Sequence, residues 1–185
     1  MIEENLKDFI RLKRPEQGKI KPQIEDIINA NLDGDMKKTA LDFAAYIRDN
    51  YMPLKWSGLN TWENDFCHIV MFIETAAKWG NSYPPNWLII LSIDIDKYES
   101  LIAEEGLQQI IWDNVFYCVH KNNEGKKDLG CSPIKGCAGG VTKTFLGKEF
   151  RGVCKGRTWS VFNPGEATLN GIKKLLELDK KARGK

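Results

Sequence analysis

Apolar residues recur at helical spacing along the first 51 residues of the chain. The spacing of three and four positions predicts a short amphipathic helix over residues 2–13, a second short helix after Pro22, and a longer helix from about Met36 to Tyr51. Proline and glycine interrupt regular backbone structure, so we predict a break between the first two helices, at Pro15, Gly18 and Pro22.

In the middle of the chain, short apolar runs replace the helical spacing. Residues 66–73 and 87–95 are typical of strands, and residues 54–62 predict a strand or another extended segment. Helical spacing returns over residues 107–119. A short apolar run at residues 159–162 then predicts a further strand.

Three residues near the C-terminus form a helix-start pattern. Asn163 is the expected N-cap, Pro164 occupies the first helical position, and Glu166 lies three residues after the cap. Strands and helices occur without a regular strand–helix alternation. We therefore predict an α+β fold, in which N-terminal, central and C-terminal helices pack on a small, mainly antiparallel sheet.

The length of 185 residues suits one domain with an added arm. We predict an N-terminal helical arm over residues 1–34 and a single α+β domain over residues 35–185, with an irregular cysteine-containing loop at residues 118–154. The longest apolar runs are too short to cross a membrane, and the N-terminus lacks the apolar region of a secretion signal. We therefore expect a cytoplasmic protein that does not contact membranes.

The formal net charge of +2 conceals an uneven distribution of charge along the chain. Residues 1–120 carry 12 basic and 19 acidic side chains, whereas residues 121–185 carry 15 basic and 6 acidic ones. Such a difference indicates either that the two parts dock on each other or that a basic face binds an acidic partner.

Four of the five cysteines lie in one glycine- and lysine-rich stretch, at Cys118, Cys131, Cys137 and Cys154. An odd number of cysteines argues against a fully disulfide-bonded secreted protein. Four thiolates can hold Zn²⁺ in a closed tetrahedral site, and His120 is available to replace one of them. No Cys-x-x-Cys pair is present, and buried or free thiols, or a redox pair of Cys131 and Cys137, are alternatives.

Basic residues alternate with aromatic ones in the same part of the chain. This mixture is typical of a surface that binds phosphates and stacks a base, or that meets an acidic protein surface. The alternative is a solvated loop whose aromatic rings turn into the core. The residues predicted to bind the partner are Lys135, Lys143, Lys148, Arg151, Lys155, Arg157 and Trp159, with Phe145 and Phe150 between them.

Two patterns suggest catalysis, and each has a structural explanation. Cys67 and His68 resemble a nucleophile and its base, but neighbouring residues on a strand point to opposite faces. Asp94 and Asp96 alternate at the end of a predicted strand, face the same side and suit a divalent cation, although such residues commonly cap the next helix. We therefore predict that the protein is not an enzyme.

Several short motifs follow one another between about residues 41 and 178: Asn50-Tyr51-Met52-Pro53-Leu54-Lys55-Trp56, Asn60-Thr61-Trp62, Ile111-Trp112-Asp113-Asn114, Cys118, Cys137-Ala138-Gly139-Gly140, Leu146-Gly147-Lys148-Glu149-Phe150, Val153-Cys154 and Phe162-Asn163-Pro164. In this order they resemble an uncharacterised family of small bacterial proteins common in clostridia. The family's third cysteine motif usually reads Cys-Ala-Pro-Gly. The resemblance implies a shared fold and no particular activity.

These observations favour a non-catalytic interaction protein that binds an acidic protein surface or a nucleic acid through its basic face. Small domains of this kind include inhibitors of host nucleic-acid enzymes, of the anti-CRISPR or anti-defence type. The alternative is a small structural-zinc or thiol-redox protein in which the four clustered cysteines carry the function.

Overall fold

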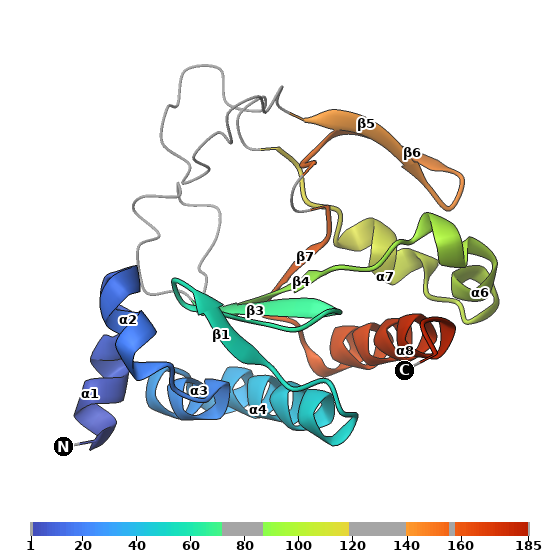
Figure 1. Ribbon diagram of the computed structural model, residues 1–185. Helices are drawn as coiled ribbons and strands as arrows, with labels where there is room; N and C mark the ends of the chain where they lie inside the picture. The colour runs from blue at the N-terminus through green and yellow to red at the C-terminus, as the bar shows by residue number, and fades with distance from the viewer. Residues whose placement is uncertain (1, 72–86, 119–139, 156–157, 185) are drawn as a thin grey trace. The chain divides into compact units, whose positions relative to one another are not determined.

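A computed structural model describes residues 2–71, 87–118, 140–155 and 158–184 (Figure 1). These residues form seven α-helices, one 3₁₀-helix, a five-stranded sheet and a two-stranded sheet, which confirms the predicted α+β class. The chain divides into two compact units. The sheet unit comprises residues 1–73, 85–93 and 161–185, and the hairpin unit comprises residues 74–84 and 94–160.

The sheet unit contains five helices and five strands among its described residues. Its helices are α1 (Ile2–Phe9), α2 (Arg14–Ile20), α3 (Ile24–Asn31), α4 (Gly34–Asp49) and α8 (Glu166–Ala182). Its strands are β1 (Lys55–Gly58), β2 (Thr61–Glu63), β3 (Cys67–Met71), β4 (Trp87–Leu91) and β7 (Ser160–Phe162), whose first residue belongs to the hairpin unit. The predicted strands at residues 66–73, 87–95 and 159–162 are therefore confirmed.

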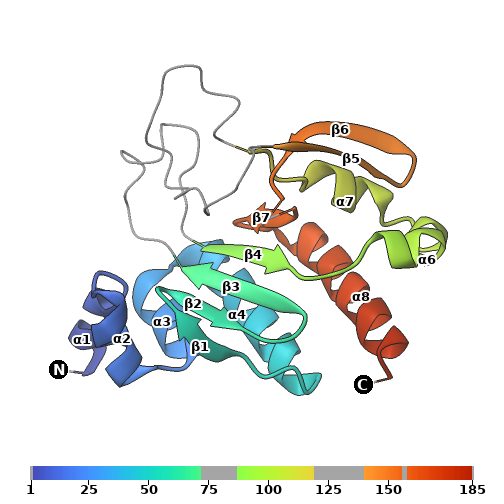
Figure 2. The ribbon, with the colours of Figure 1, turned by 45° about the horizontal axis from the view of Figure 1, so that its top comes forward.

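The sheet has the order β1-β2-β3-β4-β7, and the pairs from β1 to β4 are antiparallel. Side chains alternate between the two faces of a strand, and on β3 Cys67, Ile69 and Met71 are buried whereas His68 and Val70 are half-buried. The buried face packs on helices, as the contact of the Phe43 and Trp87 rings at 6.4 Å illustrates (Figures 1 and 2).

The N-terminal helices are attached to the β1–β2 turn by a buried glutamine. The Gln17 side chain is fully buried, and its amide nitrogen donates to the carbonyl oxygens of Phe9 and Leu12 and to the side-chain oxygen of Asn60. Its amide oxygen accepts a hydrogen bond from the backbone nitrogen of Asn60 at 2.8 Å. The division between an arm over residues 1–34 and a domain over residues 35–185 stays a prediction.

The predicted break at Pro15 and Gly18 is wrong, because both residues lie in helix α2. Proline is tolerated in the first turn of a helix, where its missing N–H would have no helical partner. Gly18 faces Trp56 so closely that a Cβ atom at this position would lie 3.3 Å from the indole ring. The glycine therefore allows α2 to pack against β1.

The predicted N-cap at Asn163 is also wrong, since helix α8 begins at Glu166 with Gly165 as its N-cap. Asn163 instead extends the pairing with β4. Its backbone nitrogen donates to the carbonyl oxygen of Trp87 at 3.0 Å, and its side-chain oxygen accepts from the backbone nitrogen of Trp87 at 3.1 Å.

The hairpin unit contains the 3₁₀-helix η1 (Asp96–Tyr98) and helices α6 (Glu99–Glu104) and α7 (Gln108–Asp113). Helix α7 is shorter than the predicted helix over residues 107–119. Asn114 follows the last helical residue of α7, and its side chain donates to the carbonyl oxygen of Ile110 at 2.8 Å. The next residues are extended, and the backbone nitrogen of Phe116 donates to the carbonyl oxygen of Thr158 at 2.8 Å.

Strands β5 (Val141–Phe145) and β6 (Lys148–Val153) form an antiparallel hairpin inside the stretch that we expected to be an irregular loop. The hairpin pairs in turn with residues near the end of α7, through a bridge between Tyr117 and Val153. Gly140 lies against the backbone of Gly152, where a Cβ atom would come within 2.5 Å of it, so only glycine fits there.

Candidate functional site

The aromatic residues of the predicted basic surface lie inside the hairpin unit. The side chains of Phe145, Phe150 and Trp159 are only 2%, 5% and 7% exposed. The ring of Phe145 lies 5.8 Å from that of Phe150 and 4.7 Å from that of Trp159, measured between ring centroids. These rings form a small core beneath the hairpin, so their faces are not available to stack on a nucleic-acid base.

Two lysines of the hairpin lie over these rings, on the same face. Register pairs Lys143 with Phe150 and Lys148 with Phe145, and this places all four side chains on one side of the hairpin. The Lys148 ammonium lies 5.0 Å from the Trp112 ring and 5.3 Å from the Phe150 ring. The Lys143 ammonium lies 5.8 Å from the Phe145 ring and donates to the hydroxyl of Thr158 at 3.2 Å.

The other face of the hairpin is polar and exposed. Arg151, whose side chain is 82% exposed, donates to the Glu149 carboxylate at 2.7 Å, and this hydrogen bond raises the pKa of the guanidinium. Lys155 is exposed immediately after the hairpin. The structure thus brings Lys143, Lys148, Arg151 and Lys155 into one short ordered segment, whereas Lys135 and Arg157 lie outside the described residues.

Charges of opposite sign occupy different segments of the hairpin unit. Residues 94–113 carry six acidic side chains and one basic one, and all six acidic side chains are exposed. Residues 140–155 carry four basic side chains and one acidic one. Charge is therefore segregated between the helical segment and the hairpin.

Cys118 and Cys154 lie on two paired segments of the hairpin unit. The backbone nitrogen of Cys118 donates to the carbonyl oxygen of Gly152, and that of Cys154 donates to the carbonyl oxygen of Phe116, on either side of the Tyr117–Val153 bridge. Neighbouring residues of an extended segment point to opposite faces, so both thiols lie on the face opposite Tyr117. The two residues are diagonal neighbours, a placement in which the Cα atoms are about 7–8 Å apart.

Cys118 is buried, Cys154 is half-buried, and both are free thiols. The other predicted zinc ligands, Cys131, Cys137 and the substitute His120, lie outside the described residues. Within the described ranges, no three histidine, cysteine, aspartate or glutamate side chains are grouped closely enough to hold a metal ion.

Cys67 and His68 do not form a nucleophile–base pair. Cys67 belongs to the buried face of β3, where burial raises the pKa of its thiol to about 12. His68 belongs to the opposite face, where its Nδ1 atom lies 3.1 Å from the Glu63 carboxylate. Asp94 and Asp96 are both exposed and lie after the end of β4.

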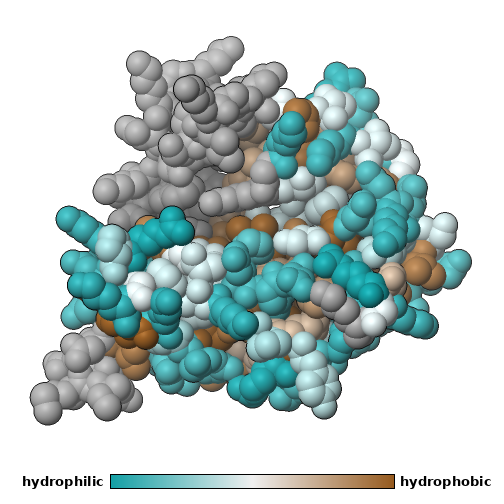
Figure 3. Space-filling view, in the orientation of Figure 1, coloured by the Kyte–Doolittle hydropathy of each residue, from teal (hydrophilic) through white to brown (hydrophobic). Residues whose placement is uncertain are grey.

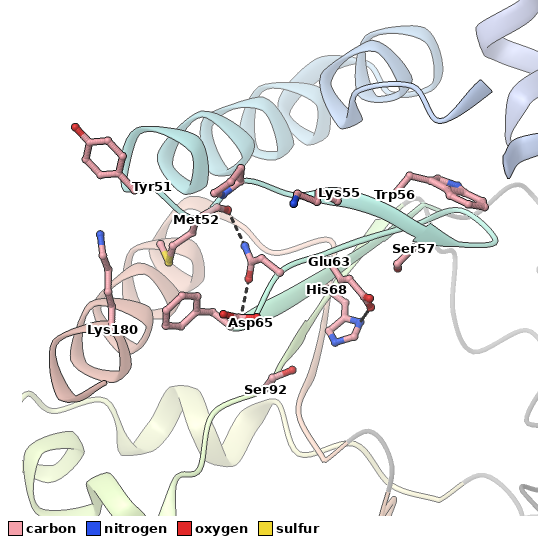
Figure 4. A pocket seen from close by; sticks show the side chains of 13 residues that line it. Tyr51, Met52, Lys55, Trp56, Ser57, Glu63, Asp65, His68, Ser92 and Lys180 are labelled. Atoms are coloured by element: carbon pink, nitrogen blue, oxygen red, sulfur yellow. Dashed lines mark hydrogen bonds and ion pairs between the residues drawn. The ribbon is translucent and has the colours of Figure 1, made fainter. Parts of the chain in front are cut away.

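Sequence reasoning missed a pocket of about 1100 Å³ in the sheet unit (Figure 4). Its lining comes from the segment after α4, from the β2–β3 turn, and from one residue of α8. Register places Lys55 opposite Glu63 and Glu63 opposite His68, and these three side chains line the pocket from one face of the sheet. The alternation of charged and apolar residues in β1–β3 was the available signal.

Comparisons with protein families, with curated proteins and with solved structures found no match to this chain. Within the described ranges, no helix is both long enough and apolar enough to span a bilayer. On the face shown in Figure 3, hydrophilic side chains cover most of the described surface and hydrophobic ones appear in small separate patches.

Proposed function

We propose that the chain is a non-catalytic interaction protein that uses its β5–β6 hairpin to bind an acidic partner. The observation that carries this proposal is the segregation of charge in the hairpin unit. Four basic side chains in residues 140–155 have only Glu149 to offset them. An ordered hairpin that presents several cations in one segment attracts an acidic surface and guides its approach.

The burial of the rings supports recognition of charge and not of bases. Proteins that grip single-stranded nucleic acid stack bases on exposed aromatic faces. Here the rings of Phe145, Phe150 and Trp159 are buried, while Lys148, Arg151 and Lys155 are exposed. The proposed partner is therefore an acidic protein surface or a nucleic-acid backbone that is bound without regard to base sequence.

Where the acidic partner belongs to a nucleic-acid enzyme of the host, such binding makes the chain an inhibitor of the anti-CRISPR or anti-defence type. The proposal places the protein in the cytoplasm, where such enzymes act. We also propose that the chain is related to the small clostridial proteins that its sequence motifs resemble.

The test is fluorescence anisotropy with two probes, a labelled polyglutamate peptide and a labelled duplex oligonucleotide, at low and at physiological salt. The variant carries Lys148→Gln, Arg151→Gln and Lys155→Gln. Its control carries the same loss of charge at three exposed lysines of the sheet unit, Lys19→Gln, Lys21→Gln and Lys38→Gln. We expect the hairpin variant to lose binding while the control retains it.

The probe that binds more tightly identifies the class of partner. Binding should weaken with salt, because counterions compete for the exposed cations. If neither probe binds at low salt, or if the control variant loses as much affinity as the hairpin variant, the proposal is wrong.

A second candidate function, a structural-zinc or thiol-redox protein, is favoured by the placement of Cys118 and Cys154 on one face. Two thiols that are diagonal neighbours on paired segments suit two positions of a zinc site, for which Cys131, Cys137 and His120 are the proposed further ligands. Zinc would supply structural order in this part of the chain.

This candidate is tested by the metal content of protein purified without chelator, together with a count of titratable thiols. One zinc per chain and masked thiols would support the structural-zinc function. Metal-free protein with five reactive thiols after unfolding would contradict the structural-zinc function. An unchanged thiol count after mild oxidation would contradict the thiol-redox function.

A further inference from the structure

The pocket of the sheet unit has walls that are fixed by hydrogen bonds. The Asn64 side chain donates to the carbonyl oxygen of Met52 at 2.8 Å and accepts from the backbone nitrogens of Phe66 and Cys67 at 2.8 and 2.9 Å. It therefore ties the β2–β3 turn to the segment that enters β1. The pocket exists before any ligand arrives, which lowers the entropic cost of binding.

Arg183 fixes the opposite wall. Its guanidinium donates to the carbonyl oxygens of Asp65 and Ser92 at 3.1 and 3.3 Å and lies 4.8 Å from the Phe66 ring. It also forms an ion pair with the buried carboxylate of Asp179. The end of β4 and the β2–β3 turn are thereby held to helix α8.

These contacts occupy several hydrogen-bond acceptors at the pocket. The carbonyl oxygens of Met52, Asp65 and Ser92 accept hydrogen bonds from Asn64 and Arg183, and Lys180 donates to the carbonyl oxygen of Asn50, next to the lining. The Glu63 carboxylate lies 3.1 Å from Nδ1 of His68.

Among the described residues, the Lys55 ammonium and the hydroxyls of Ser57 and Ser92 have no hydrogen-bond partner within the protein, and all three side chains line the pocket. Figure 4 shows Lys55, the Glu63–His68 pair and Ser92 around the same space. A cation and hydroxyl donors that line one concave site are suited to an anionic oxygen group.

The apolar part of the lining indicates that the ligand carries more than an anionic group. Met52 and Tyr51 line the pocket beside the donors. Tyr51 is 89% exposed and has a φ of +58°, a left-handed conformation. It is the residue after the C-cap of α4, where this conformation commonly ends a helix, and the helix end thereby places the ring at the pocket.

We propose that this pocket binds a small organic anion, a carboxylate joined to an aromatic or apolar body. Lys55 holds the carboxylate beside the hydroxyl of Ser57, and Tyr51 and Met52 contact the body. A single negative charge fits better than two, because the carboxylates of Glu63 and Asp65 also line the pocket and repel further charge. The proposal does not depend on the partner that the hairpin binds.

The experiment is a titration of the ¹⁵N-labelled full chain with benzoate, followed by amide chemical shifts. Benzyl alcohol serves as the neutral analogue and phenyl phosphate as the doubly charged one. We expect saturable shifts at the pocket with benzoate and at least roughly tenfold weaker binding of benzyl alcohol, since a hydrogen bond to a charged group is lost. Phenyl phosphate should also bind more weakly than benzoate.

Variants test the assigned residues. Lys55→Met should weaken benzoate binding about tenfold, whereas Lys55→Arg should retain most of it. The matched control Lys38→Met removes an exposed lysine of α4 that does not line the pocket and should leave the affinity unchanged. Equal losses from Lys55→Met and Lys38→Met, equal binding of benzyl alcohol, tighter binding of phenyl phosphate, or no saturable shift with benzoate would each overturn the proposal.

Discussion

The sheet unit and the hairpin unit use their polar side chains in opposite ways. The sheet unit buries Gln17 and Asp179 completely or nearly so. Hydrogen bonds join Gln17 to Asn60, and Asp179 forms an ion pair with Arg183, whose guanidinium reaches the carbonyl oxygens of Asp65 and Ser92. Within the described part of the hairpin unit, charged side chains are exposed or half-buried and lie over a core of rings. Polar groups of the first unit hold the fold together, and those of the second remain available to a partner.

The largest difference should appear in the reactivity of the cysteine thiols. Burial raises the pKa of Cys67, in the sheet unit, from 9.0 to about 12. At neutral pH the reactive thiolate is then about a thousandfold rarer than for an ordinary thiol. Alkylation with iodoacetamide, followed by peptide mass analysis, should label half-buried Cys154 quickly and Cys67 only as fast as the protein unfolds.

The same shift has a consequence for stability, and its sign follows from the direction of the shift. The folded state keeps the Cys67 proton to a higher pH than the unfolded state does, so the free energy of unfolding falls as the pH rises from about 9 to about 12. Cys67→Ala should flatten this decline. Rapid native labelling of Cys67, or an unchanged decline in the variant, would contradict the burial argument.

The next largest effect is expected at Gln17. Gln17→Leu fills the same space but leaves the carbonyl oxygen of Leu12 and the backbone nitrogen of Asn60 without their partner. Buried groups that lose a hydrogen bond cost about 1–3 kcal/mol each, so we expect a loss of about 3 kcal/mol in urea unfolding. The control Gln23→Leu makes the same change at an exposed position and should have little effect. If the two variants lost similar amounts of stability, the hydrogen bonds of Gln17 would not be what attaches the N-terminal helices to the sheet.

The sequence predicted the features that depend on neighbouring residues. The alternation in β3 and the apolar run of β4 were sufficient for both strands. Gly18 and Asn163 were misread because their roles depend on partners far away in the sequence, Trp56 and Trp87. Such contacts leave no local signal.

The hairpin surface and the pocket also differ in how close together in sequence their residues lie. The cations of the hairpin are close together in sequence, so composition alone located Lys143, Lys148, Arg151 and Lys155. It could not show that the rings between them are buried, because the pairing of Tyr117 with Val153 is long-range. The pocket was missed altogether, since its lining runs from Tyr51 to Lys180.

A smaller effect, of opposite sign, is expected at Tyr51. Tyr51→Gly removes the strain of a left-handed φ at the end of α4, where glycine is the favoured residue, and should stabilise the fold by about 1 kcal/mol. It also removes the exposed ring from the pocket, so benzoate binding should weaken. Urea unfolding and the chemical-shift titration measure the two effects. A variant that is less stable, or that binds benzoate as tightly as before, would show that the ring has a structural role only.

The smallest effect on stability is expected from the charges of the hairpin. Lys155→Gln removes an exposed cation for which no ion pair is present among the described residues, so the free energy of unfolding should change by less than about 0.5 kcal/mol. Its effect should appear in partner binding. Removal of one cation that contacts a phosphate reduces the slope of log affinity against log salt concentration by about one. The same substitution at Lys38 is the control, and it should change neither quantity. A large loss of stability in Lys155→Gln would mean that the hairpin, like the sheet unit, uses its charge to maintain the fold, and the contrast between the two units would no longer hold.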